Sequence, residues 1–93
     1  MEVYLVCFDI SDDALRRRIG NLLLGYGERV QRSVFEVSVR TPGDLAELRS
    51  ALRELIEPDD DDIRLYRLCA DCRRASSTVD GQRIAEFPAI LVV

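Results

Sequence analysis

Short stretches of β-branched and aromatic residues alternate along the chain with stretches in which apolar residues recur every three or four positions. The apolar run at residues 3–8 predicts a buried strand that ends at Asp9. Helical spacing follows from residue 12 to 26, with Ser11 as the expected N-cap and Gly27 where helices often end in a left-handed residue. The N-terminal part is therefore predicted to be a strand followed by a helix.

Residues 29–39 have extended character, but their apolar positions change parity partway along. They are even at first and odd from Phe35 onward. Because a slip of one residue moves side chains to the opposite face of a sheet, we expect a bulge or tight reversal near residues 32–34. The segment is predicted to form two strands, of which the first is short.

A second helix is predicted to begin at Thr41, as its N-cap, with Pro42 in the first helical position. Pro58 is expected to end it. Its apolar stripe consists of Leu45, Leu48, Leu52, Leu55 and Ile56.

The last part of the chain is predicted to contain a strand at residues 63–68 and a turn from Cys69 to Arg74. A polar loop at residues 75–87 and an apolar strand at residues 89–93 complete the chain.

This order of elements predicts a ferredoxin-like βαββαβ fold of the α+β class with an extra C-terminal strand. We expect one domain over residues 1–93, in which residues 75–93 are a polar connection plus that strand. The first strand is apolar on both faces, and one layer of helices covers only one of them. The sequence therefore predicts a homodimer whose sheets pack face to face.

The composition is that of a globular protein, with 47% hydrophobic and 32% charged residues. No apolar run has the length of a membrane span and the N-terminus has no signal-like pattern, so the cytoplasm without a membrane partner is expected. The net charge of −4 argues against a protein that coats nucleic acid non-specifically. All 13 basic residues are Arg, however, and the first 40 residues are relatively basic, while the acidic run at residues 59–62 is expected to be a solvated loop.

The chain contains no His, so any hydrolysis must use carboxylates or a metal ion. Asp9 is the main candidate because it directly follows a buried strand at the rim of the sheet, although it could instead accept hydrogen bonds from the following turn. Cys69 and Cys72 have the spacing of half a zinc site, but a zinc site needs four ligands. We interpret this pair as structural.

Three segments, in this order and spacing, resemble a known family: FDI followed by SDDALRRRI at residues 8–19, GERVQRSVFE at residues 27–36 and YRLCADC at residues 66–72. They are similar to the family of CRISPR-associated protein two. The resemblance covers about residues 2–74, and the segment RVQRSVFE is its most specific part.

The resemblance implies a metal-dependent endonuclease that acts on single-stranded RNA or double-stranded DNA and takes part in spacer acquisition with the CRISPR integrase. It implies that Asp9 of two chains shares one Mg²⁺, with nucleic-acid phosphate as a further ligand. The residues implied to contact nucleic acid are Phe8, Arg16, Arg18, Arg29 and Phe35. Arg18 and Arg29 are the expected phosphate contacts, and Phe35 is expected either to stack on a base or to pack in the core.

Three alternatives stay open at this point. The dimer could be a non-catalytic DNA-binding scaffold of the integrase complex. The chain could also be a ferredoxin-like regulatory module for a small molecule, although it has no glycine-rich loop to line a pocket. A toxin-type ribonuclease of the same fold is the third.

Overall fold

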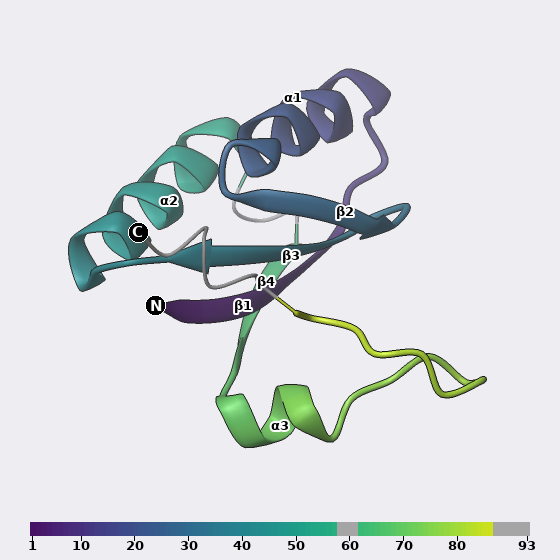
Figure 1. Ribbon diagram of the computed structural model, residues 1–93. Helices are drawn as coiled ribbons and strands as arrows, with labels where there is room; N and C mark the ends of the chain where they lie inside the picture. Colours follow the sequence, from purple (N-terminus) through teal and green to yellow (C-terminus); the bar gives the residue numbers. More distant parts are fainter. Residues whose placement is uncertain (58–61, 87–93) are drawn as a thin grey trace.

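The computed structural model describes residues 1–57 and 62–86. The elements are β1 (Glu2–Asp9), α1 (Asp13–Leu24), β2 (Gly27–Gln31), β3 (Val34–Val39), α2 (Pro42–Leu55), β4 (Asp62–Leu68) and α3 (Ala70–Arg74). Four antiparallel strands form one sheet in the order β2-β3-β1-β4, and α1 and α2 cover one face of it (Figure 1). This arrangement confirms the predicted ferredoxin-like fold, while Pro58 and the predicted strand at residues 89–93 lie outside the described residues.

The two long helices begin at side-chain caps. The side chain of Thr41 accepts a hydrogen bond from the backbone N–H of Asp44 at 3.1 Å, which confirms the predicted start of α2. For α1 the predicted cap, Ser11, is wrong: the carboxylate of Asp12 accepts from the N–H of Leu15 at 2.8 Å. A carboxylate in this position also interacts favourably with the positive end of the helix.

The end of α1 also differs from the prediction, because Gly27 is not its left-handed cap. The helix ends at Leu24, Gly25 follows in right-handed conformation with φ of −72°, and Gly27 already belongs to β2. A Cβ atom at Gly27 would collide with the backbone carbonyl of Glu36 on β3. Glycine is therefore required here by the close approach of two strands.

The predicted interruption between residues 29 and 39 is present. The register of β2 against β3 shifts between Arg29 and Gln31, and the chain then reverses at residues 32–33. The bulge lies within β2, slightly earlier than expected, and the reversal at residues 32–33 separates this short exposed strand from the buried strand β3.

The core lies between the sheet and the two helices. Alternate residues of the central strands point towards α1 and α2, and Phe35 is 0% exposed at its centre. The cluster contains Tyr4, Val6, Phe8, Ile10, Ile19, Leu23, Phe35, Val37, Val39, Leu48 and Leu52.

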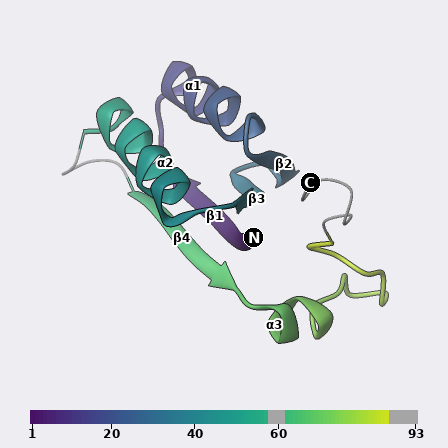
Figure 2. The ribbon, with the colours of Figure 1, turned by 60° about the vertical axis from the view of Figure 1, so that its left-hand side comes forward.

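The opposite face of the sheet, which we call the open face, carries Val3, Leu5 and Cys7 of β1. A second copy of the chain was the expected cover for this face. In the structure the chain's own residues 83–86 cover part of it: Ala85 is 4% exposed and its backbone is hydrogen-bonded to Glu36, itself 7% exposed. Figure 2 shows the chain after α3 turning back towards the sheet.

Residues 69–74 were predicted to form a turn, and instead most of them form the short helix α3. Its cap is the sulfur of Cys69, which accepts from the N–H of Cys72 at 3.4 Å. The chain then forms a loop closed by a bridge between Ser77 and Arg83. Among the described residues, no helix has both the length and the apolar character that crossing a membrane requires.

Candidate nucleic-acid and metal site

Asp9 is the last residue of β1 and is exposed. It continues the alternation of Leu5 and Cys7, so it lies on the open-face side of the strand. Within residues 1–57 and 62–86, no hydrogen bond or ion pair engages its carboxylate. The structure thus favours a carboxylate available to a ligand over one that merely accepts hydrogen bonds from the following turn.

The cross-strand neighbour of Asp9 is Asp62 at the start of β4. Nε of Arg64 binds the Asp62 carboxylate at 3.0 Å, and both side chains are more than half exposed. Hydrogen bonds with Tyr66 and Asp62 raise the pKa of Arg64, so this cation stays charged beside Asp62. Of the two neighbouring carboxylates, Asp62 is paired with a cation, and Asp9 has no such partner among the described residues.

A carboxylate oxygen suits a hard cation such as Mg²⁺, which takes about six oxygen ligands. The part of the chain that the structure describes contains no group of three or more His, Cys, Asp or Glu residues that could hold a metal ion. The described residues therefore fit half of a metal site, with Asp9 as its ligand, and the other half has to come from a second chain and from phosphate.

At the same end of β1, on the helix side of the sheet, lies a hollow of about 250 Å³ that we call the arginine hollow. Phe8, the residue before Asp9, lines it. Its lining consists of Phe8, Asp13, Arg16, Arg17, Arg29 and Arg32. With four guanidinium groups against one carboxylate, the hollow is suited to bind an anion.

Arg16 differs from the other arginines of the hollow because its donors are already engaged. Its Nη1 donates to the backbone carbonyls of Ile10 at 2.6 Å and Ser11 at 2.9 Å, and Nη2 pairs with Asp13. Arg16 therefore holds the loop that connects Asp9 to α1. The implied direct contact with nucleic acid does not fit this arrangement, and Arg16 is better described as a positioning residue.

Helical spacing explains which neighbouring arginines reach the hollow. Arg17 and Gly20 are three residues apart and share one side of α1, the side that approaches Arg29. Arg18 is exposed but does not line the hollow, so the structure does not bring this expected phosphate contact together with the others. Arg17 and Arg32 take its place, and Arg32 was missed because no sequence pattern links the β2–β3 turn to α1.

Arg29 lies on β2 with its guanidinium carbon 5.2 Å from the centre of the Phe35 ring, a cation–π arrangement. The Phe35 ring in turn stacks on Phe8, with centroids 6.1 Å apart. Because Phe35 is 0% and Phe8 6% exposed, neither ring can stack on a base in this structure. Core packing, the other interpretation of Phe35, is the one that fits, and both rings support the floor under Arg29.

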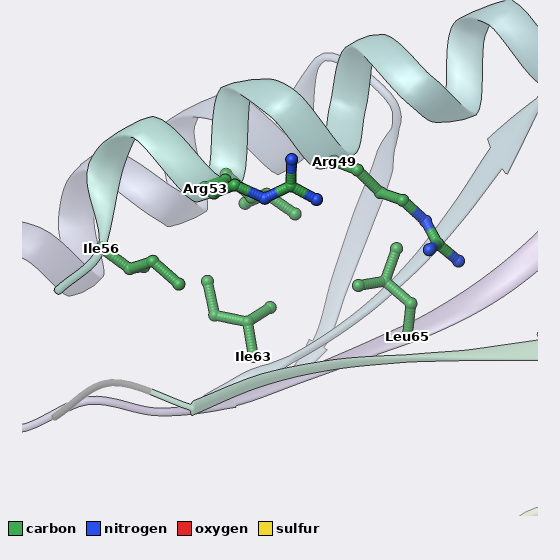
Figure 3. A pocket seen from close by; sticks show the side chains of 6 residues that line it. Arg49, Arg53, Ile56, Ile63 and Leu65 are labelled. Carbon is green, nitrogen blue, oxygen red and sulfur yellow. The ribbon is translucent and has the colours of Figure 1, made fainter. Parts of the chain in front are cut away.

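A second hollow, of about 340 Å³, lies between α2 and β4 (Figure 3). Arg49 and Arg53 project from α2 at its rim, and no ion pair is formed by either of them among the described residues. Its floor is apolar and consists of Leu52, Ile56, Ile63 and Leu65. An apolar floor offers no hydrogen-bond donors to a phosphate group. The arginine hollow is therefore the better candidate for binding nucleic acid.

The fold and the site together define a class: a small ferredoxin-like protein with a strand-end carboxylate and a cluster of arginines at the same end of its first strand. The sequence profile of the family described as "CRISPR associated protein Cas2" matches residues 1–75. The chain belongs to this family, as its three motifs predicted.

Relatives of known name and solved structures agree. The chain is 48% identical over 71 residues to "CRISPR-associated endoribonuclease Cas2 1" of Chloroflexus aurantiacus, covering 75% of each chain. It is 44% identical over 64 residues to "CRISPR-associated endonuclease Cas2 2" of Thermus thermophilus, covering 69% of this chain and 70% of the relative. A chain of the "Partial Cas6-RT-Cas1--Cas2 complex" matches with a TM-score of 0.84 and 38% identity over 94% of this chain and 100% of that one.

Proposed function

We propose that this chain is a metal-dependent endonuclease of CRISPR adaptation that hydrolyses phosphodiester bonds of RNA or double-stranded DNA in the cytoplasm. The observation that carries the proposal is an exposed carboxylate without a partner among the described residues, Asp9, at the same end of β1 as four arginines. Names of relatives support it, because they are described as endoribonucleases or endonucleases.

In this proposal the working unit is a homodimer in which Asp9 of each chain contributes to one Mg²⁺ site. One Asp per chain is too few for a cation that needs about six oxygen ligands, so two copies plus phosphate and water are the minimum. When bound, Mg²⁺ supplies an activated water and offsets the charge that develops on the phosphate. The apolar part of the open face supports association: Tyr66 is 48% exposed there, beside Leu5.

The chain's own residues provide binding and orientation. Arg17, Arg29 and Arg32 are exposed residues that line the arginine hollow, and in this proposal they bind the phosphate backbone. Arg16 fixes the loop after Asp9 through two backbone carbonyls, and so holds the carboxylate in place relative to the hollow. These contacts carry no base information, so little sequence preference is expected.

The proposed partner is the CRISPR integrase, with which the dimer takes part in spacer acquisition. Support comes from the structural neighbour, whose description names Cas1 and Cas2 in one complex. The scaffold alternative also has an observation in its favour, because Asp9 is not part of the lining of the arginine hollow and the described residues of one chain supply only half a metal site.

The test is Asp9→Asn, with Asp80→Asn as the matched control in an exposed loop. Asparagine keeps the shape of the side chain and removes the charge that holds a cation. Mg²⁺-dependent cleavage of RNA and DNA oligonucleotides should fall by several orders of magnitude in Asp9→Asn and stay unchanged in the control. Light scattering should give about twice the 10.6 kDa chain mass for the unsubstituted protein and both variants.

Cleavage that survives Asp9→Asn would refute the catalytic role of this carboxylate. A protein that binds DNA and the integrase but cuts nothing would establish the scaffold alternative. In that case Asp9→Asn should leave spacer acquisition unharmed.

A further inference from the structure

Two thiols meet outside the proposed site, where β4 leads into α3. Cys69 and Cys72 are both exposed, and their sulfur atoms lie 3.3 Å apart. The first turn of α3 fixes this arrangement, because the backbone N–H of Cys72 donates to the Cys69 sulfur at 3.4 Å. The pair is close, accessible and held by the backbone rather than by chance side-chain positions.

The two sulfurs are chemically unequal. Hydrogen bonds from the backbone and then the side chain of Cys72 lower the pKa of Cys69, and the charges of Arg67 and Arg74 act in the same direction. The hydrogen bond with Cys69 raises the pKa of Cys72. Cys69 is therefore the more acidic thiol of the pair and the one expected to attack first.

Metal binding explains this pair less well than sulfur chemistry does. A structural zinc ion needs four ligands, and among residues 1–57 and 62–86 no third His, Cys, Asp or Glu joins the two sulfurs. An intramolecular disulfide needs only the two groups that are present. The sulfurs have to approach from 3.3 Å to a bond length of about 2.05 Å, a short movement within one helical turn.

We propose that Cys69 and Cys72 form a redox-active dithiol that exchanges with low-molecular-mass disulfides of the glutathione type. The Cys69 thiolate attacks one sulfur of the small disulfide, the S–S bond breaks, and one small thiolate leaves while a mixed disulfide forms on Cys69. Cys72 then loses its proton and attacks the Cys69 sulfur, which releases the second small thiolate. Two protein thiols are oxidised to one disulfide, one small disulfide is reduced to two thiols, and the two protons end on the leaving thiolates.

Cys7 provides an internal comparison in the same chain. It lies half-buried on the open face of β1, and burial raises the pKa of its thiol. Its low thiolate fraction and restricted access predict that Cys7 reacts slowly with the same small disulfides.

The experiment exposes the full chain to oxidised glutathione, quenches it with iodoacetamide and locates each modification by mass spectrometry. In the unsubstituted protein we expect a disulfide between Cys69 and Cys72, while Cys7 is alkylated. Cys72→Ala should accumulate glutathione on Cys69, because the resolving thiol is gone. Cys69→Ala should react at least about tenfold more slowly than the unsubstituted protein.

Alkylation rates as a function of pH give a second readout. The apparent pKa of Cys69 should lie below that of an ordinary thiol, and it should rise in Cys72→Ala, where the side-chain donor is lost. Circular dichroism verifies that both variants fold. Equal reactivity of Cys7 and Cys69, or lasting glutathione adducts on the unsubstituted protein, would overturn the proposal.

Discussion

The sequence gives no reason to distinguish Arg16 from Arg29, and both were expected to contact nucleic acid. Their surroundings in the structure give them different roles. The side chain of Arg16 is 25% exposed, and its guanidinium binds two backbone carbonyls and Asp13. The guanidinium of Arg29 lies over the Phe35 ring, and no hydrogen bond or ion pair engages it within the described part of the chain. A charge that is already satisfied holds the structure together, whereas an exposed one binds a ligand.

Substituting each arginine by Gln separates these roles. Arg16→Gln should lower the free energy of unfolding by about 1.5–3 kcal/mol, the range for hydrogen bonds to charged groups. Arg29→Gln should change stability little, weaken binding to DNA and reduce the slope of log K against log [salt] by about one phosphate contact. Urea denaturation and binding titrations at several salt concentrations measure both effects.

The matched control is Arg53→Gln, an exposed arginine on α2 away from the arginine hollow. It should leave the salt slope and the affinity unchanged. If Arg16→Gln reduces the salt slope as much as Arg29→Gln does, Arg16 is a phosphate contact after all.

The sequence was sufficient to predict candidate residues but not their surroundings. Asp9 could be found because a carboxylate directly follows a buried strand. Phe35 could not be assigned, since burial depends on how β3 packs under α1 and α2. No sequence pattern indicated the position of Arg32. Its approach to α1 depends on the conformation of the β2–β3 turn, which is set by tertiary structure.

At the scale of elements, two glycines determine how α1 and β2 meet. Gly20 is on the buried side of α1, where a Cβ atom would lie 2.7 Å from Nη2 of Arg29 and 3.6 Å from the Phe35 ring. Gly27 is on β2, where a Cβ atom would meet the backbone of β3. The group in the way at Gly20 is the end of the flexible Arg29 side chain and can move. The group in the way at Gly27 is the backbone of β3 and cannot move.

Gly20→Ala should therefore affect binding and not folding. Alanine favours a helix over glycine by about 1 kcal/mol, so thermal stability should be retained or raised. The guanidinium of Arg29 has to leave its position over Phe35, and affinity for DNA should fall by about two- to fivefold, the equivalent of an exposed cation–π contact. Calorimetry and DNA titration provide the two measurements.

Gly27→Ala is the companion variant with the opposite expectation. Its backbone clash should lower stability by more than about 1 kcal/mol. An unchanged affinity in Gly20→Ala would show that the position of Arg29 over the ring does not matter for binding.

Element boundaries show where local reasoning succeeds. Thr41 and Pro42 predicted the start of α2 because capping is decided within four residues. Gly27 was misinterpreted because a helix-ending glycine and a strand glycine under a neighbouring backbone look the same in sequence. α3 was missed because it has only five residues and its cap is a cysteine sulfur.

At the scale of the whole molecule, the open face of the sheet is shared between apolar residues and a buried carboxylate. Glu36 is directly opposite Leu5 on β1 and Glu28 on β2, and residues 83–86 cross over it. Because the residues of β1 are apolar on both faces of the strand, the sequence was enough to predict that this face of the sheet needs a cover. It could not predict that the chain supplies part of that cover, because Ala85 is far along the sequence and adopts a positive φ of 55°.

Glu36 makes this cover sensitive to pH. Burial raises the pKa of Glu36 above its ordinary value of 4.5, opposed by the hydrogen bond with the Ala85 backbone and assisted by the charge of Glu28. For a carboxyl group whose pKa is raised by folding, the folded state holds the proton longer than the unfolded chain does. Its contribution to stability is fully present below the unfolded pKa and is lost as the pH rises through the folded pKa.

Glu36→Gln tests this assignment, because Gln keeps an oxygen that accepts from the Ala85 N–H and has no proton to lose. The free energy of unfolding of the variant should exceed that of the unsubstituted protein by an amount that is smallest near pH 4 and grows towards pH 7. Urea denaturation at fixed protein concentration across this range measures the difference, in which the other carboxylates cancel. Glu28→Gln, on the exposed strand β2, is the control and should give a smaller dependence, since it only removes a neighbouring charge. A difference that does not change with pH would mean that Glu36 is not protonated beneath residues 83–86.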